Sequence, residues 1–200
     1  MRYKAQKILD FFHKQGGISR YSSIRKAGFH PDILKFLEKE KKVEKIARGL
    51  YKLSDTELGA YPDFVLTSLQ ASQGVICLIS ALYFYEVTTE IPRFVNIAIP
   101  AGSRANKISY PPVKYYRFSY KAWESGIEEY ESDGYKMKIY SLPKTIADCF
   151  KFRNKISPNV CMEAIKTAVQ EKRIKPKDIM HYAKICRVDR VIKPILETLL

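Results

Sequence analysis

Residues 43–53 have the sequence VEKIARGLYKL. Two runs rich in apolar residues, 43–47 and 50–53, are separated only by Arg48 and Gly49. A glycine in a two-residue turn adopts the backbone conformation that joins neighbouring antiparallel strands. The stretch therefore predicts a β-hairpin. Because this hairpin follows three predicted helices, it indicates which fold we expect at this end of the chain.

The segment before the hairpin predicts three helices. Apolar residues recur at helical spacing over 3–15, and a glycine pair follows them. Ser19 can cap a short second helix that ends at Gly28. Pro31 suits the first position of a third helix. Three helices and a hairpin in this order are typical of a winged helix-turn-helix, so we expect residues 1–54 to form a DNA-binding domain of that kind.

The DNA-binding candidates of this domain are polar side chains in three places. Hydroxyls and backbone N–H groups at the start of the second helix can hold a phosphate. The third helix would enter the major groove, and the hairpin would reach a minor groove or a phosphate. The candidates are Ser19, Arg20, Tyr21, Ser22, His30, Asp32, Lys35, Lys39, Arg48 and Lys52. The alternatives are ordinary solvated side chains and a winged helix that docks a protein.

The charge of the chain favours a polyanionic partner. Its 200 residues include 35 Lys and Arg against 21 Asp and Glu, a net charge of +14. Residues 1–54 carry +9, residues 55–135 carry −4, and residues 136–200 carry +9. Nucleic acid is the first partner that this predicts and an anionic membrane surface the second, while a charge that only aids solubility is the alternative.

The rest of the chain predicts a second domain of mixed α/β type. Residues 55–62 are polar, contain glycine and proline, and predict a linker. Residues 63–200 predict an α/β domain that ends in a helical tail, so the fold class that we expect is mixed α+β. The expected strands are 94–100, 113–118 and 135–140, and the expected helices are 63–73, 143–152, 158–171, 176–185 and 188–199.

Catalytic motifs are missing from the sequence. It contains no phosphate-binding loop, no nucleophile elbow and no D-x-D pair, so we expect neither an enzyme nor a cofactor. The four cysteines form no C-x-x-C pair, which favours buried thiols over a zinc site. A cluster of four carboxylates close to two lysines keeps a nuclease site as an alternative, although a solvated acidic loop is favoured. The cluster consists of Glu128, Glu129, Glu131 and Asp133, and the lysines are Lys136 and Lys138.

The sequence predicts a cytoplasmic protein. No run approaches the ~18–20 apolar residues of a membrane-spanning helix. The first residues, MRYK, lead into a polar helical pattern and predict no secretory signal.

The second basic block contains another candidate surface. Lys144, Lys151, Arg153 and Lys155 lie on or just after one predicted helix, where they could contact an RNA or a bound nucleotide. A solvated helix face is the alternative. Lys144 and Lys151 flank Asp148 at helical spacing, which predicts ion pairs on the helix surface.

Three parts of the chain resemble the AbiEi-like antitoxins. Residues 79–100 contain a Ser-Ala-Leu helix start, an Ile-Pro pair and an apolar strand that ends in proline, in the order typical of that family. Residues 142–148, LPKTIAD, resemble its [RK]-T-[LI]-x-D helix, and residues 47–51, ARGLY, resemble the end of its winged helix. One departure is Tyr85-Glu86, where the family often has His-Gly.

The resemblance implies an antitoxin of a bacterial type IV toxin–antitoxin system, linked to abortive phage infection. In such proteins the winged helix binds repeats in the operon's own promoter and represses it. The C-terminal domain counters a nucleotidyltransferase-like toxin, and the two proteins need not touch. Two alternatives come from other classes: a ligand-responsive transcriptional regulator, and a metal-dependent DNA-processing enzyme that a winged helix targets.

Overall fold

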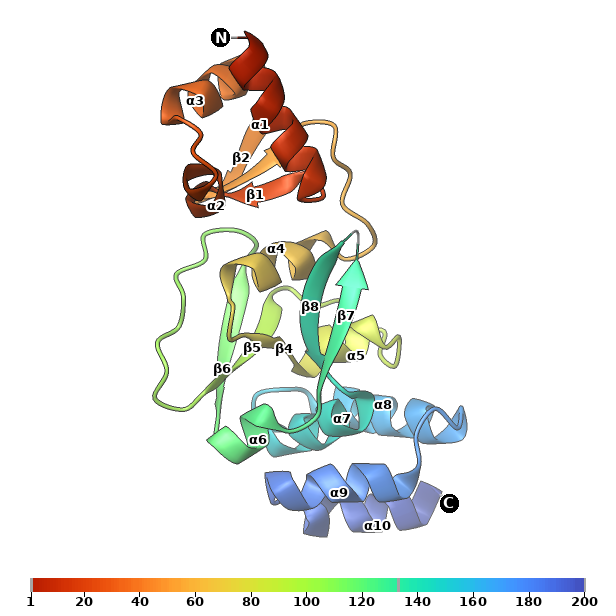
Figure 1. The fold of residues 1–200 in the computed structure, drawn as a ribbon. Coiled ribbons are helices and arrows are strands. Elements are labelled where there is room, and N and C mark those ends of the chain that lie inside the picture. Colours follow the sequence, from red (N-terminus) through yellow and green to blue (C-terminus); the bar gives the residue numbers. More distant parts are fainter. Residues whose placement is uncertain (1, 133, 200) are drawn as a thin grey trace.

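The computed structural model describes residues 2–132 and 134–199, and its fold is mixed α+β. Figure 1 shows a small group of helices and strands at the N-terminal end of the molecule, a sheet in the middle and a helical layer at the C-terminal end. We call residues 2–54 the first unit, and residues 62–132 with 134–199 the second unit. No described helix has the length and apolar character needed to cross a membrane.

The first unit contains three helices and a small antiparallel sheet. Its elements are α1 (Arg2–Lys14), β1 (Ile18–Arg20), α2 (Tyr21–Lys26), α3 (Pro31–Lys39), β2 (Val43–Ala47) and β3 (Leu50–Leu53). The sheet order is β1-β3-β2, so β3 lies between the other two strands. The predicted hairpin is confirmed at both strands. The sequence did not predict β1, which has only three residues.

The start of α2 differs from the prediction. Ser19 was expected to cap this helix, but it lies in β1 opposite Tyr51 and is buried. The helix begins after Arg20, whose side chain makes no capping hydrogen bond. The reason is that pairing with β3 holds residues 18–20 extended, while the Tyr21 N–H donates to the Gly49 carbonyl at 2.8 Å.

The second unit contains a five-stranded sheet and seven helices among its described residues. Its elements are α4 (Pro62–Gln70), β4 (Val75–Ile76), α5 (Leu78–Phe84), β5 (Val95–Pro100), β6 (Val113–Phe118), α6 (Tyr120–Glu124), β7 (Ile127–Ser132), β8 (Tyr135–Tyr140), α7 (Leu142–Lys151), α8 (Pro158–Gln170), α9 (Pro176–Cys186) and α10 (Asp189–Leu199). The sheet order is β6-β5-β4-β8-β7. The four predicted C-terminal helices and the three predicted strands are confirmed.

Both faces of this sheet are covered. Because side chains alternate along a strand, Ile97 and Ile139 pack on one face, while Ala98 and Tyr140 pack on the other. Helices α7–α10 build the core on the Tyr140 side. On the Ile139 side lie α4 and apolar residues of the first unit, and Figure 1 shows α4 between that unit and the strands.

The two units are in direct contact. Ile18, Ala47 and Leu50 of the first unit share a buried cluster with residues of the second. The Ile18 N–H also donates to the Tyr135 hydroxyl at 2.7 Å. Part of the predicted linker, 55–62, packs against the same cluster through Leu58 and Tyr61. The units therefore hold a defined arrangement, and the segment between them is more than a flexible spacer.

Candidate nucleic-acid interface

Helix α3 presents a basic face to solvent. Pro31 occupies its first turn, and the His30 side chain accepts a hydrogen bond from the Asp32 N–H at 3.3 Å, which caps the helix. Leu34 and Leu37 are buried against the unit's core. Lys35 and Lys39, one turn apart, therefore point away from it, and both are exposed. Neither lysine forms an ion pair with a described residue.

Arg20 and Arg48 lie elsewhere, between the two units. Both line a cavity of about 500 Å³, together with Arg104 and Lys107 of the second unit. Figure 1 shows α3 on the outer side of the first unit, away from the sheet of the second. The hairpin turn thus faces the second unit. The structure brings Arg20 and Arg48 together, but it does not bring them to the exposed face of α3.

The other candidates of the first unit are divided between exposed and engaged side chains. Ser22 is exposed at the start of α2, whereas Tyr21 is half-buried with its ring 6.4 Å from that of Tyr51. Lys52 is half-buried, and its Nζ donates to the Thr56 carbonyl at 2.9 Å. Buried Ser19 has no surface on which to hold a phosphate. Its expected role at the DNA is therefore wrong.

Lys144 is not a surface residue, although the sequence placed it in a basic patch. It is 0% exposed, and its Nζ lies 2.5 Å from the equally buried Asp148 Oδ2. The ammonium also lies 4.1 Å from the centre of the Tyr140 ring. The physical reason is that α7 packs against α5 on one side and α9 on another, so Lys144 and Asp148 have no access to solvent. Of the two ion pairs that were expected at Asp148 on the helix surface, the one with Lys144 forms inside the core instead, and among the described residues Lys151 forms none.

The buried pair has a third partner. The Cys186 thiol donates to Asp148 Oδ1 at 3.1 Å, so both carboxylate oxygens are engaged. Burial raises the pKa of Asp148, and the nearby Lys144 ammonium opposes that rise. Burial and then the Asp148 charge raise the pKa of Cys186 to about 12, which keeps this thiol protonated as a donor. The Cys186 hydrogen bond thereby links α9 to the buried pair of α7.

The remaining candidates of the second basic block lie near the end of α7. Lys151 is half-buried, and Arg153 and Lys155 are exposed. Arg153 Nη1 donates to the Phe150 carbonyl at 2.9 Å, a common way to satisfy the last carbonyls of a helix. Without Lys144, the basic patch expected here reduces to two exposed residues and one half-buried residue.

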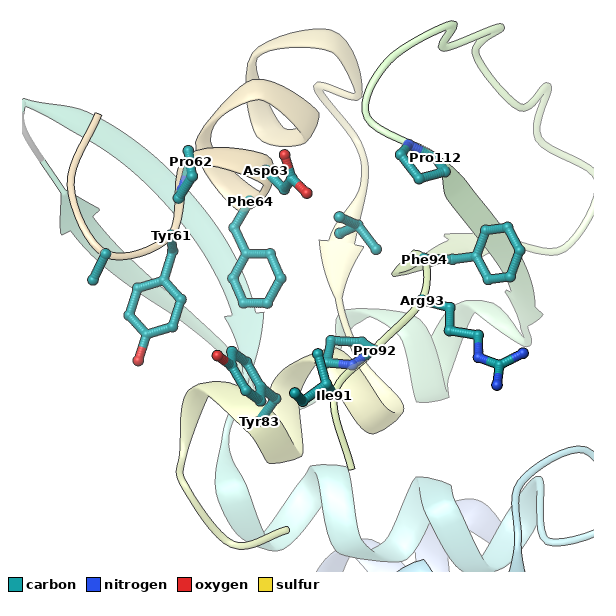
Figure 2. Close-up of a pocket in the computed structure, with 12 residues that line it drawn as sticks. Tyr61, Pro62, Asp63, Phe64, Tyr83, Ile91, Pro92, Arg93, Phe94 and Pro112 are labelled. Carbon is teal, nitrogen blue, oxygen red and sulfur yellow. The ribbon is translucent and has the colours of Figure 1, made fainter. Parts of the chain in front are cut away.

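A second hollow lies on the second unit, and the sequence did not point to it. This aromatic hollow has a volume of about 200 Å³ and is lined mainly by aromatic residues and prolines, with one arginine. Figure 2 shows Tyr83, Ile91 and Pro92 on one side of it and Tyr61 with Phe64 on another. Exposed apolar side chains mark it: Ile91 is 72% exposed and Phe94 is 47% exposed. Such residues on both sides of Pro92 are the signal that could have found it.

The acidic residues of the nuclease alternative lie on β7 and not in a loop. Glu128 accepts hydrogen bonds from Tyr130 at 2.6 Å and Tyr85 at 3.0 Å, while Glu129 pairs with Lys136 at 3.8 Å. Asp133 lies outside the described residues. Across 2–132 and 134–199, no three side chains of His, Cys, Asp or Glu gather as ligands of one metal ion would. The acidic strand escaped prediction because charged residues are uncommon in strands.

No family model fits the chain, and no curated protein matches it in sequence.

Proposed function

We propose that this protein is a DNA-binding transcriptional repressor, whose first unit is a winged helix-turn-helix that reads DNA with α3. The observation that carries the proposal is the exposed pair Lys35 and Lys39 on a capped helix, one turn apart and without an ion pair to any residue that the structure describes. Unpaired cations on a helix that is packed by its opposite face are available to a base edge or a phosphate.

The arrangement of the first unit supports this proposal. Helix, strand, helix, helix and hairpin follow one another, and the sheet order is β1-β3-β2. In a winged helix-turn-helix the helix before the hairpin is the reading helix, and here that helix is α3. Residues 1–54 also carry a net charge of +9, which favours association with a polyanion.

We further propose that the second unit is the antitoxin part of a type IV toxin–antitoxin pair. The sequence resemblance supports this, together with one structural observation. Residues 79–100, which carry much of the resemblance, supply Tyr83, Ile91 and Arg93 to the aromatic hollow. A surface of exposed aromatic and apolar side chains suits contact with another macromolecule better than the buried Lys144–Asp148 pair does.

DNA binding is tested with the full chain and a labelled duplex from immediately upstream of its gene. We expect tighter binding to this duplex than to a shuffled one of equal length. With about six phosphate contacts, affinity should fall by roughly a thousandfold between 50 and 200 mM salt. Equal affinity for both duplexes, or an affinity that salt does not change, would contradict the repressor proposal.

The antitoxin role is tested in cells that express the nucleotidyltransferase-like toxin that this proposal expects a neighbouring gene to encode. Growth rescue and a promoter–reporter assay are the two readouts. Ile91→Ser with Phe94→Ser should abolish rescue and leave repression intact, because both side chains lie at the aromatic hollow. Met162→Ser is the matched control, since Met162 is an exposed apolar residue of α8 (41%). If the double variant rescues growth as well as the parent does, the aromatic hollow has no part in the antitoxin role.

The two roles are separable on this proposal. Lys35→Ala with Arg48→Ala should abolish repression, while the variant should still rescue cells from the toxin. Charge reversal at the exposed Arg153 and Lys155 tests whether the second basic block takes part in rescue. Loss of both activities in the folded Lys35 and Arg48 variant would mean that rescue depends on DNA binding.

A further inference from the structure

The cavity between the two units gathers positive charge from both of them. Arg20 and Arg48 come from the first unit, and Arg104 and Lys107 come from the loop 101–112 between β5 and β6. Among the described residues, no carboxylate lines it. In the part of the chain that the structure describes, none of the four cations forms an ion pair.

Hydrogen bonds fix the walls of this cavity. Arg20 Nη2 donates to the Leu69 carbonyl in the last turn of α4. The Asn106 side chain donates to the Gln70 carbonyl at 2.5 Å, and the Gln70 side chain donates to the Tyr110 carbonyl at 2.8 Å. The last carbonyls of a helix have no partner within the helix, so these bonds satisfy them and hold the loop against α4. Arg20 is thus held by its own hydrogen bond, and the loop that carries Arg104 and Lys107 is held against α4 before any ligand arrives.

Four cations in one hollow repel one another unless an anion neutralises them. Arginine presents planar pairs of N–H donors that match the oxygens of a phosphate, and lysine adds a point charge. The cavity opens to solvent and is lined by four cationic side chains, which fits a phosphate better than an apolar ligand.

We propose that this cavity binds phosphates of nucleic acid, and that the second unit thereby contributes Arg104 and Lys107 to the DNA contact. The inference rests on the proposed DNA binding and extends it from one unit to two. Because the turn at Arg48 faces the cavity, the hairpin contacts the DNA backbone there, while α3 reads the bases. Phosphate contacts carry no sequence information, so the two surfaces have different roles.

The test compares Arg104→Gln/Lys107→Gln with the parent, using the full chain, the upstream duplex and the shuffled duplex. Lys166→Gln/Lys184→Gln is the control, since it removes the same charge from exposed residues of α8 and α9. We expect the cavity variant to weaken binding of both duplexes alike, by about tenfold or more. The slope of log affinity against log salt should become shallower by about 2.

The outcomes are distinguishable. If the parent binds the upstream duplex specifically and the cavity variant behaves like the control, the inference is overturned and the proposed function stands. If the parent binds neither duplex, the proposed function fails, and the assignment to DNA fails with it. Inorganic pyrophosphate is the second arm, measured by calorimetry. Pyrophosphate binding that the cavity variant loses, with duplex binding unchanged, would assign the cavity to a free phosphate ligand and overturn the assignment to DNA.

Discussion

The two basic ends of the chain carry the same net charge, +9 over 1–54 and +9 over 136–200, but they hold their lysines in different environments. On α3, Lys35 and Lys39 are exposed because only one face of the helix packs against the first unit. On α7, Lys144 is fully buried because α5 and α9 cover the helix from different sides. Net charge therefore does not locate a binding surface, since the number of packed faces of a helix determines whether a cation is exposed or buried.

The largest effect is expected where the buried pair is broken. Lys144→Met leaves the Asp148 carboxylate buried without its cation, so it should lower the free energy of unfolding by about 3–5 kcal/mol. Urea unfolding followed by circular dichroism measures this. The control, Lys166→Met on the exposed face of α8, should leave the urea midpoint nearly unchanged.

A double variant separates charge from packing. Lys144→Met with Asp148→Leu removes both charges and keeps apolar volume, so it should recover most of the lost stability. If Lys144→Met alone unfolds at the same urea concentration as the parent, the buried pair has no structural role. The lysines of α7 and α3 would then not differ in their effect on stability.

The same variant predicts a pH dependence. In Lys144→Met, burial without a cation raises the pKa of Asp148 further above its unfolded value of about 3.9. Between the unfolded and the folded pKa the folded state binds more protons, so stability falls as pH rises through that window. The stability gap to the parent should therefore shrink from pH 8 towards pH 5, by up to about 1.4 kcal/mol for each unit inside the window. A difference in free energy of unfolding between the two proteins that stays the same from pH 8 to pH 5 would contradict this.

A smaller effect is expected on the exposed helix. Lys35→Ala should cost about 1–3 kcal/mol of binding free energy to the upstream duplex and relax the preference over a shuffled one, if Lys35 reads a base edge. Thermal unfolding should not change. Lys14→Ala, at the exposed end of α1, is the matched control. Binding and preference equal to the parent's would show that α3 is not the reading helix.

The smallest effect is expected just beyond α7. Arg153→Gln with Lys155→Gln changes exposed residues close to Lys144 in sequence, so it should alter the free energy of unfolding by about 0.5 kcal/mol or less. Urea unfolding beside Lys144→Met makes the comparison direct. A loss of unfolding free energy close to that of Lys144→Met would mean that Arg153 and Lys155 support the core as Lys144 does.

Local patterns were enough to predict several elements. The hairpin at 43–53 could be found because a glycine turn and two apolar runs act within a few residues of each other. The start of α3 could be found because proline at the first turn is a local signal. The aromatic hollow and the cavity at Arg48 could not, since their walls come from segments far apart in the chain.

Most helices, the hairpin and the two blocks of positive charge follow from local sequence, because periodicity, turn residues and composition are properties of neighbouring residues. Long-range packing is what pairs β1 with β3, turns Arg48 towards the second unit and buries Lys144. In α7 the polar stripe of Lys144, Asp148 and Lys151 has the same spacing as a solvated helix face. Whether water or another helix meets such a stripe depends on α9, which begins 25 residues after α7 ends. No local pattern carries that information.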